Sequence, residues 1–174
     1  MPTASLPSLI FLWGFMGSGK TSLGKKVANR LGYTFQDLDH LIEEKEEKTV
    51  QEVFDDSGEG YFRLVERDVL HQTLEMKGGP FLISTGGGTP CYYDNASWMN
   101  AHGLTVYLRQ KTGILVSRLT GQGGRPLIKR MPAEERADRI HEMITQREPF
   151  YLQAQRIVGP EKVSVGEILD KIEG

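Results

Sequence analysis

A glycine-rich loop follows a short apolar segment near the start of the chain. Leu9–Trp13 are five consecutive apolar residues, and Gly14–Thr21 read GFMGSGKT. These eight positions satisfy the pattern G-x-x-x-x-G-K-[ST], and the residues after them have the spacing of an amphipathic helix. Glycines allow main-chain N–H groups to converge on phosphate oxygens, while the start of the helix adds unpaired donors and partial positive charge. The sequence therefore predicts a strand, a phosphate-binding loop and a helix in that order, and with them a bound nucleotide.

Two side chains at the end of this loop have distinct expected roles. Lys20 would reach the outer phosphates of the nucleotide as a point charge. The hydroxyl of Thr21 would be a ligand of the Mg²⁺ that accompanies ATP. The residues expected to contact the nucleotide in this segment are Gly14, Gly17, Ser18, Gly19, Lys20, Thr21 and Ser22.

Short apolar runs alternate with longer segments of helical period along the rest of the chain. This alternation is typical of a parallel sheet with helices on both faces. We predict an α/β fold, a three-layer sandwich in which helices flank a five-stranded parallel sheet, as a single domain over residues 1–174. The strands are expected at Leu9–Trp13, Tyr33–Asp37, Phe81–Ser84, Leu104–Leu108 and Arg156–Val158.

Capping signals and apolar spacing place the helices. The first is expected over Lys20–Leu31, with the next glycine as its stop. Capping boxes at Thr49–Glu52 and Ser164–Glu167 predict two further helix starts. A mostly helical insertion is expected over about residues 39–76 and a glycine-rich lid over about residues 120–131. Because the lid has few apolar anchors, we expect it to be poorly ordered alone and to close over ligands.

The composition excludes several classes of protein. Hydrophobic residues make up 39% of the chain and charged residues 25%, close to globular averages. The longest apolar run is far too short to span a bilayer, and a net charge of −2 gives no basic surface for nucleic acid. The single cysteine, Cys91, cannot form an internal disulfide, which suits a reducing compartment. We therefore expect a cytoplasmic monomer that binds small molecules and has neither a nucleic-acid nor a membrane partner.

Two aspartates flank Leu38 at the end of the second expected strand. In an extended chain, residues two apart point to the same side, so Asp37 and Asp39 would share a face at the carboxyl end of the strand. One acid could then serve the Mg²⁺ shell, and the other could accept a proton from an attacking hydroxyl group or orient it. The alternative is that Asp39 caps a helix containing Leu41 and Ile42.

The phosphate loop by itself does not distinguish a kinase from a GTPase or another ATPase. The guanine-reading pattern Asn-Lys-x-Asp is absent from the sequence. The one Asp-x-x-Gly, Asp55–Gly58, ends an expected helix rather than a strand. A GTPase is therefore disfavoured.

Six short motifs occur along the chain in a recognisable order. They are GFMGSGKT, DLD, GEGYFRLVE from Gly58, STGGG, GRPL from Gly124 and REPFY from Arg147. With these motifs in register from about Leu9 to the final helix, the chain resembles the shikimate kinase family. The resemblance implies a small P-loop kinase of the nucleoside monophosphate kinase type, with a substrate-binding helical insertion and a mobile lid. It also implies transfer of the γ-phosphoryl group of ATP to the 3-hydroxyl of shikimate, in the pathway toward chorismate and the aromatic amino acids.

The resemblance assigns roles to residues outside the phosphate loop. It implies that Asp39 holds the substrate hydroxyls and is the candidate base, and that Asp37 contacts Mg²⁺ through water. It implies that Arg63 and Arg147 bind the shikimate carboxylate, for which two guanidinium groups offer bidentate, charge-assisted hydrogen bonds. The remaining implied contacts are Gly86, Gly87 and Gly88 with the substrate, Arg118 with the adenine, and Arg125 in the lid with the phosphates, where it completes a catalytic set with Lys20 and Asp39.

Two other functions stay open from the residues. Another small-metabolite kinase of this fold, such as a gluconate kinase, would use similar groups, because the arginines and the Asp-x-Asp favour a compact hydroxylated carboxylate without excluding a sugar acid. A non-catalytic ATP-binding module is the second alternative. Such a module would be expected to lose the acids or the lid arginine, whereas Asp37, Asp39 and Arg125 are all present.

Overall fold

One parallel sheet is at the centre of the structure, a computed structural model that describes residues 5–121 and 126–174. Its strand order is β2-β3-β1-β4-β5, and every neighbouring pair is parallel. The strands are β1 Leu9–Trp13, β2 Thr34–Asp37, β3 Phe81–Ser84, β4 Leu104–Leu108 and β5 Arg156–Val158. Four of the predicted strands are confirmed to the residue, and β2 begins one residue later than expected. The predicted α/β fold is thus confirmed.

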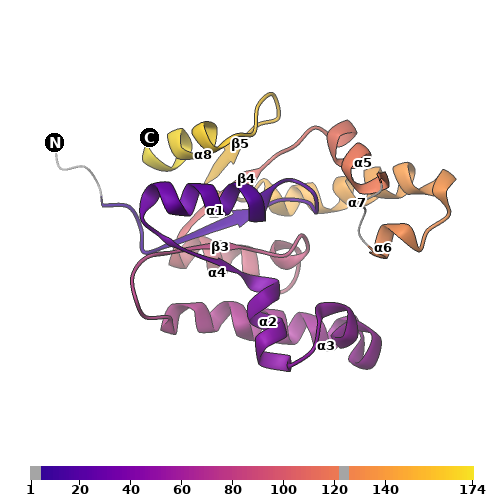
Figure 1. Ribbon diagram of the computed structural model, residues 1–174, viewed down its shortest axis with the longest axis horizontal. Coiled ribbons are helices and arrows are strands. Elements are labelled where there is room, and N and C mark those ends of the chain that lie inside the picture. Colours follow the sequence, from indigo (N-terminus) through magenta and orange to yellow (C-terminus); the bar gives the residue numbers. More distant parts are fainter. Residues whose placement is uncertain (1–4, 122–125) are drawn as a thin grey trace.

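Helices connect the strands and cover both faces of the sheet (Figure 1). They are α1 Lys20–Leu31, α2 Leu38–Glu46, α3 Val50–Gln72, α4 Asn95–His102, α5 Thr112–Thr120, α6 Pro126–Lys129, α7 Arg136–Tyr151 and α8 Val165–Glu173, with 3₁₀ turns at Thr73–Glu75, Thr89–Cys91 and Ala133–Glu135. Figure 1 shows α1 and α8 together over one face, and α2, α3 and α4 beyond the other. Within the described part of the chain, none of these helices is long and apolar enough to cross a membrane.

The central strand β1 shows why both faces of the sheet are covered. All five of its residues are buried. Because side chains alternate along a strand, Leu9, Phe11 and Trp13 pack in a cluster with residues of α2, α3 and α4. Ile10 and Leu12 pack in a second cluster with residues of α1 and α8. A parallel strand buried on both faces requires a continuous apolar run, which is what this segment contains.

The predicted helix ends are present. Gly32 follows α1 in the left-handed conformation, with a φ of 73°. Thr49 and Glu52 form the complete capping box at the start of α3. The hydroxyl of Ser164 accepts a hydrogen bond from the N–H of Glu167 at the start of α8. These starts and stops were readable in the sequence because each depends on residues within one helical turn.

The helical insertion differs from the expectation in two ways. It begins at Leu38 rather than Asp39, because α2 follows β2 without a loop. Its long helix α3 is also interrupted at Gly58, where φ is 80° and ψ is 172°. This break separates a first helical part, which ends with Asp55–Gly58 as predicted, from a second part that positions Arg63.

The expected lid is described in part. Residues 122–125, which include Gly124 and Arg125, lie outside the described residues. The short helix α6 follows them, and its Ile128 is fully buried in a cluster with Phe15 and Ile140. Ile128 is thus an apolar anchor that ties α6 to the body of the protein, and the expected closure of the lid over ligands stays a prediction.

Candidate active site

The phosphate loop joins the end of β1 to the start of α1. Its backbone passes through Gly17, with a φ of 81°, and Gly19, with a φ of 97°. Glycine adopts these left-handed values at little steric cost. Because α1 begins at Lys20, the unpaired N–H groups of its first turn lie at the end of the loop. The segment thus has the geometry of the predicted phosphate site.

Two polar side chains are held inside the loop. Nζ of Lys20 donates hydrogen bonds to the carbonyl oxygens of Gly14, at 2.7 Å, and Phe15, at 3.0 Å. Oγ of Ser18 is buried and has no hydrogen-bond partner among the residues that the structure describes. A buried hydroxyl without a partner is costly in a finished site. A phosphate group would supply acceptors for both side chains, so the loop fits the nucleotide that the sequence predicts.

Thr21 and Asp37 lie together beside this loop. Oγ1 of Thr21 donates a hydrogen bond of 2.9 Å to Oδ2 of Asp37. Both are hard oxygen donors, the type that Mg²⁺ prefers, and Mg²⁺ is commonly held by one or two protein groups together with phosphates and water. Within residues 5–121 and 126–174, no cluster of three or more His, Cys, Asp or Glu residues forms an all-protein metal site. Thr21 and Asp37 therefore fit the ion that accompanies a nucleotide.

Asp37 and Asp39 do not share a strand face, contrary to the expectation from the sequence. The strand ends at Asp37, and Asp39 lies in the first turn of α2. Asp37 is the residue that caps this helix, since its Oδ1 accepts a hydrogen bond of 3.0 Å from the N–H of Asp39. The alternative that Asp39 is the cap is therefore also wrong. Asp39 nevertheless reaches the loop of three glycines after β3, because its Oδ1 would lie 3.3 Å from a Cβ added to Gly86.

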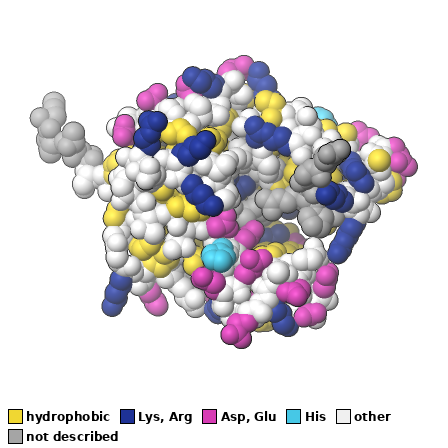
Figure 2. Space-filling model, viewed as in Figure 1, with side chains coloured by type: hydrophobic (Ala, Val, Ile, Leu, Met, Phe, Trp, Pro, Cys, Tyr) yellow, Lys and Arg dark blue, Asp and Glu magenta, His cyan; other side chains and the backbone are white. Residues whose placement is uncertain are grey.

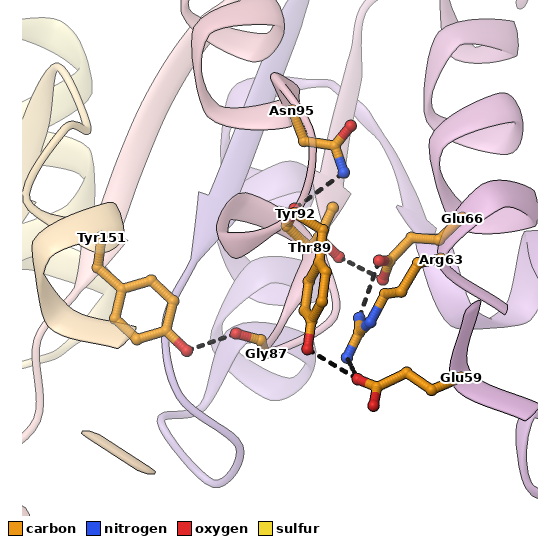
Figure 3. A network of polar contacts seen from close by, with 8 residues as sticks. All are labelled: Glu59, Arg63, Glu66, Gly87, Thr89, Tyr92, Asn95 and Tyr151. Carbon is orange, nitrogen blue, oxygen red and sulfur yellow. Dashed lines mark hydrogen bonds and ion pairs between the residues drawn. The ribbon is translucent and has the colours of Figure 1, made fainter. Parts of the chain in front are cut away.

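Arg63 is enclosed by two glutamates and an aromatic ring (Figure 3). Its Nη1 lies 2.9 Å from Oε1 of Glu66, and its Nη2 lies 3.4 Å from Oε1 of Glu59. Its Cζ is 4.0 Å from the centre of the Tyr92 ring. Burial disfavours the charged form, but the charge and hydrogen bond of Glu66 outweigh that effect and raise the pKa of Arg63. The side chain is therefore a permanent, well-held cation.

The three-glycine loop after β3 packs directly on this arginine. A Cβ added to Gly88 would lie 2.6 Å from Nη2 of Arg63. The hydroxyl of Thr89 donates a hydrogen bond of 2.8 Å to Oε2 of Glu66, which is fully buried. Glu66 thus links α3 to the glycine loop, in addition to the orienting role that its spacing from Arg63 suggests.

The family resemblance implies that Arg63 binds the substrate carboxylate, so replacing Gly88 with alanine should weaken substrate binding by displacing Arg63. The backbone of Gly88 suits any residue, with φ −96° and ψ −10°, so the effect would come from the added methyl group alone. Overpacking of this kind costs about 1–3 kcal/mol, and we expect the KM for shikimate to rise roughly tenfold or more. Gly60→Ala is the matched control in α3, since a Cβ there meets nothing within 4 Å. An unchanged KM in Gly88→Ala, measured by steady-state ADP release, would contradict this placement.

Arg147 approaches the same loop from α7. Its Nη1 would lie 3.3 Å from a Cβ added to Gly87, and its Cζ is 5.6 Å from the centre of the Phe15 ring. Within the described part of the chain, no carboxylate lies within 4 Å of this guanidinium group. The hydroxyl of Tyr151, one helical turn further on, donates a hydrogen bond to the carbonyl oxygen of Gly87 (Figure 3). α7 therefore brings a cation without a paired carboxylate to the glycine loop and ties the loop in place.

The glycine loop also touches the phosphate loop. A Cβ added to Gly87 would lie 3.3 Å from the backbone nitrogen of Met16 and 3.8 Å from the carbonyl oxygen of Gly14. Arg147 further lines a cavity of about 420 Å³ together with Cys91, Tyr92, Leu127, Met131, Arg139, Met143, Gln146 and Phe150. Figure 2 shows acidic side chains gathered over α2 and α3. The arrangement can hold an anion at the arginines and a phosphate chain beside it.

Of the arginines expected to contact the adenine and the phosphates, Arg118 and Arg125, the structure describes only the first. Arg118, near the end of α5, donates a hydrogen bond of 2.7 Å from Nη1 to the carbonyl oxygen of Gly17. It therefore lies across the phosphate loop, and its contact with a base stays a prediction. Arg125 lies outside the described residues, so its role also stays a prediction.

Four residues that the structure places around the arginines were not predicted from the sequence. They are Glu59, Thr89, Tyr92 and Tyr151. Glu59 and Tyr151 fall inside the motifs GEGYFRLVE and REPFY, whereas Thr89 and Tyr92 are the first and fourth residues after the three glycines. Their nearness to those motifs was the one available signal, since nothing in their own spacing predicts contacts made across the fold.

Comparisons with known proteins agree with this geometry. The family model described as "Shikimate kinase" matches residues 16–173. A shikimate kinase of Bacteroides thetaiotaomicron is 44% identical over 155 residues, which cover 88% of this chain and 87% of that protein.

Solved structures give the same result. The crystal structure of shikimate kinase from Bacteroides thetaiotaomicron superposes with a TM-score of 0.83 at 41% identity, covering 95% of this chain and 94% of that one. Shikimate kinase from Acinetobacter baumannii in complex with shikimate also has a TM-score of 0.83, at 30% identity, covering 97% of this chain and 91% of that one.

Proposed function

Because the chain belongs to the shikimate kinase family, we propose that it transfers the γ-phosphoryl group of ATP to the 3-hydroxyl of shikimate, giving shikimate 3-phosphate and ADP. One observation carries this proposal. Gly87 lies between Arg147 and the phosphate loop, with its Cβ position 3.3 Å from Nη1 of that arginine and 3.3 Å from the nitrogen of Met16. A small carboxylate held at the arginines would thus have its hydroxyl groups directed toward the phosphates.

The two arginines would hold the carboxylate end of shikimate. Arg63 is buried and fixed by Glu66, whereas Arg147 has no carboxylate partner among the described residues. Two guanidinium groups bind a carboxylate through charge-assisted hydrogen bonds whose directions define the orientation of the ring. The main chain of Gly86–Gly88 would line the ring, because residues without a Cβ allow a ligand to approach closely.

Asp39 would accept the proton of the attacking 3-hydroxyl, or hold that hydroxyl in line with the γ-phosphorus atom. It lies beside Gly86, with its Oδ1 3.3 Å from the Cβ position of that residue. A positioned base of this kind typically contributes about 10²–10⁴-fold to the rate. Asp39 is thus the catalytic carboxylate in this proposal.

The remaining contacts would belong to ATP. The phosphate-loop amides would bind its phosphates together with Ser18 and Lys20. Ser22, in the first turn of α1, would also contact the nucleotide. Arg118 would lie against the adenine. Bound Mg²⁺ supplies charge neutralisation at the β- and γ-phosphates, and Thr21 with Asp37 would hold it, the latter through water. On the family resemblance alone, Arg125 would reach the phosphates when the lid closes and keep water from the reaction.

We also propose a single domain over residues 1–174 that acts as a monomer in the cytoplasm. The continuous sheet, with helices on both faces, supports the first point. One cysteine, Cys91, is compatible with a reducing compartment.

A substrate panel tests the activity. ADP release would be measured with Mg·ATP and, separately, shikimate, gluconate and a nucleoside monophosphate. We expect turnover with shikimate alone to rise clearly above the background hydrolysis of ATP, because only shikimate combines a carboxylate with ring hydroxyls of the right reach. Turnover with gluconate but not shikimate would overturn the substrate, and no turnover with any of the three would favour a non-catalytic ATP-binding module.

A further inference from the structure

The ring of Tyr92 lies on the guanidinium group of Arg63. The distance from Cζ of Arg63 to the ring centre is 4.0 Å, well inside the range of a cation–π contact. Tyr92 follows the 3₁₀ turn Thr89–Cys91 and comes from a different part of the chain than α3 (Figure 3). An arginine can rotate about several side-chain bonds, so a flat ring at this distance restricts the plane that its guanidinium group can adopt.

The hydroxyl of Tyr92 fixes the ring in turn. It donates a hydrogen bond of 2.7 Å to Oε1 of Glu59, the same oxygen that lies 3.4 Å from Nη2 of Arg63. This hydrogen bond lowers the pKa of Glu59, whereas burial, assisted by the same bond, raises the pKa of Tyr92. Tyr92 thus stays a neutral donor and Glu59 a charged acceptor around neutral pH.

Arg63 itself still has hydrogen-bonding capacity. Its Nε is buried and has no partner among the described residues. Its contact with Glu59 is long, at 3.4 Å, and the Glu59 side chain is more than half exposed. The short bond to Glu66 occupies one side of the guanidinium group, so the plane of that group decides where its other N–H groups point.

We propose that Tyr92 is a positioning residue, which fixes the plane of the Arg63 guanidinium group and thereby sets the affinity of the site for the substrate carboxylate. This inference rests on the proposed function, since it concerns the same substrate site. Tyr92 acts through Arg63, so its loss affects shikimate binding and leaves the phosphate loop and Asp39 in place.

The neighbouring tyrosine offers a matched control. Tyr93 lies over Arg67, with Cζ 4.8 Å from the ring centre. It belongs to the same turn and makes the same type of contact, but it is 53% exposed, and Arg67 has no place in the proposed substrate site. A change at Tyr93 therefore reports on the turn and not on Arg63.

The test compares three variants with the wild-type protein in steady-state kinetics with shikimate and Mg·ATP. Tyr92→Leu removes the ring, Tyr92→Phe keeps the ring and removes the hydroxyl, and Tyr93→Leu is the control. We expect Tyr92→Leu to raise the KM for shikimate about tenfold, within the range of a desolvated cation–π contact, with kcat and the KM for ATP within twofold. Tyr92→Phe should stay within about threefold of wild type in all three constants, and Tyr93→Leu should not differ.

The outcomes separate this inference from the proposed function. If the wild-type protein does not phosphorylate shikimate, the proposed function fails and the positioning role falls with it. If the wild-type protein is active but Tyr92→Leu keeps its KM for shikimate, only the inference fails. Equal losses in Tyr92→Leu and Tyr93→Leu, or a loss of kcat with KM unchanged, would likewise refute a role through Arg63. Melting temperatures of the three variants identify any that merely fails to fold.

Discussion

Replacing Asp39 with asparagine should reduce the turnover of shikimate at least about a hundredfold, because the amide cannot accept the hydroxyl proton. ATP affinity should be unchanged, because Asp39 is in α2 and contacts Gly86 of the glycine loop. It does not belong to the phosphate loop, which would bind ATP. The measurement is kcat from coupled ADP release, with the dissociation constant of ATP determined by calorimetry on the same preparation.

Glu44→Gln is the control for this substitution. It also removes one carboxylate charge from α2, at an exposed position where Glu44 pairs with His40. Its turnover should match that of the wild-type protein, because exposed pairs contribute little. Near-normal turnover in Asp39→Asn would exclude the proposed role, and a loss of ATP affinity would mean that Asp39 acts at the nucleotide instead.

Replacing Arg147 with alanine should weaken shikimate binding by about 2–3 kcal/mol, as expected when a charge-assisted hydrogen bond to a bound carboxylate is lost. That free energy corresponds to a rise of roughly 30- to 150-fold in the dissociation constant. Arg147→Lys should recover only part of the affinity, because an ammonium group cannot form the bidentate contact. Calorimetric titration with shikimate measures all three proteins.

The control for Arg147 lies two turns earlier on the same helix. Arg139 lines the same cavity, but it pairs with Glu142 at 2.6 Å, and more than half of its side chain is exposed. Arg139→Ala should therefore bind shikimate with wild-type affinity. Equal affinity in Arg147→Ala and the wild-type protein would remove Arg147 from the substrate site.

Arg63 is a poorer target for the same test. Nη1 of Arg63 lies 2.9 Å from Oε1 of Glu66, which is fully buried. Truncating Arg63 would therefore leave the buried Glu66 carboxylate without a cationic partner. Breaking a buried pair by removing one partner costs about 3–5 kcal/mol of stability. A loss of binding in Arg63→Ala would therefore combine the effect of unfolding with the loss of a substrate contact. Arg147 has no carboxylate partner among the described residues, so its truncation leaves no buried carboxylate unpaired.

Local patterns predicted much of the structure. The strand, phosphate loop and helix at Leu9–Leu31 depend on neighbouring residues, so apolar runs, glycines and caps were sufficient to locate them. The aspartate pair shows the limit of this reasoning. Residues two apart share a face only while the chain stays extended, and the side chain of Asp37 ends the strand by capping α2.

The sequence by itself determined the parallel sheet, the phosphate loop and, through its motifs, the family. Only the tertiary structure decided how the substrate side is assembled. Glu66 binds Thr89 across 23 residues, and Tyr92 binds Glu59 across 33. Such contacts exist because the turn after β3, Thr89–Cys91, packs against both α3 and α7, and no pattern within a short segment specifies which side chains meet there.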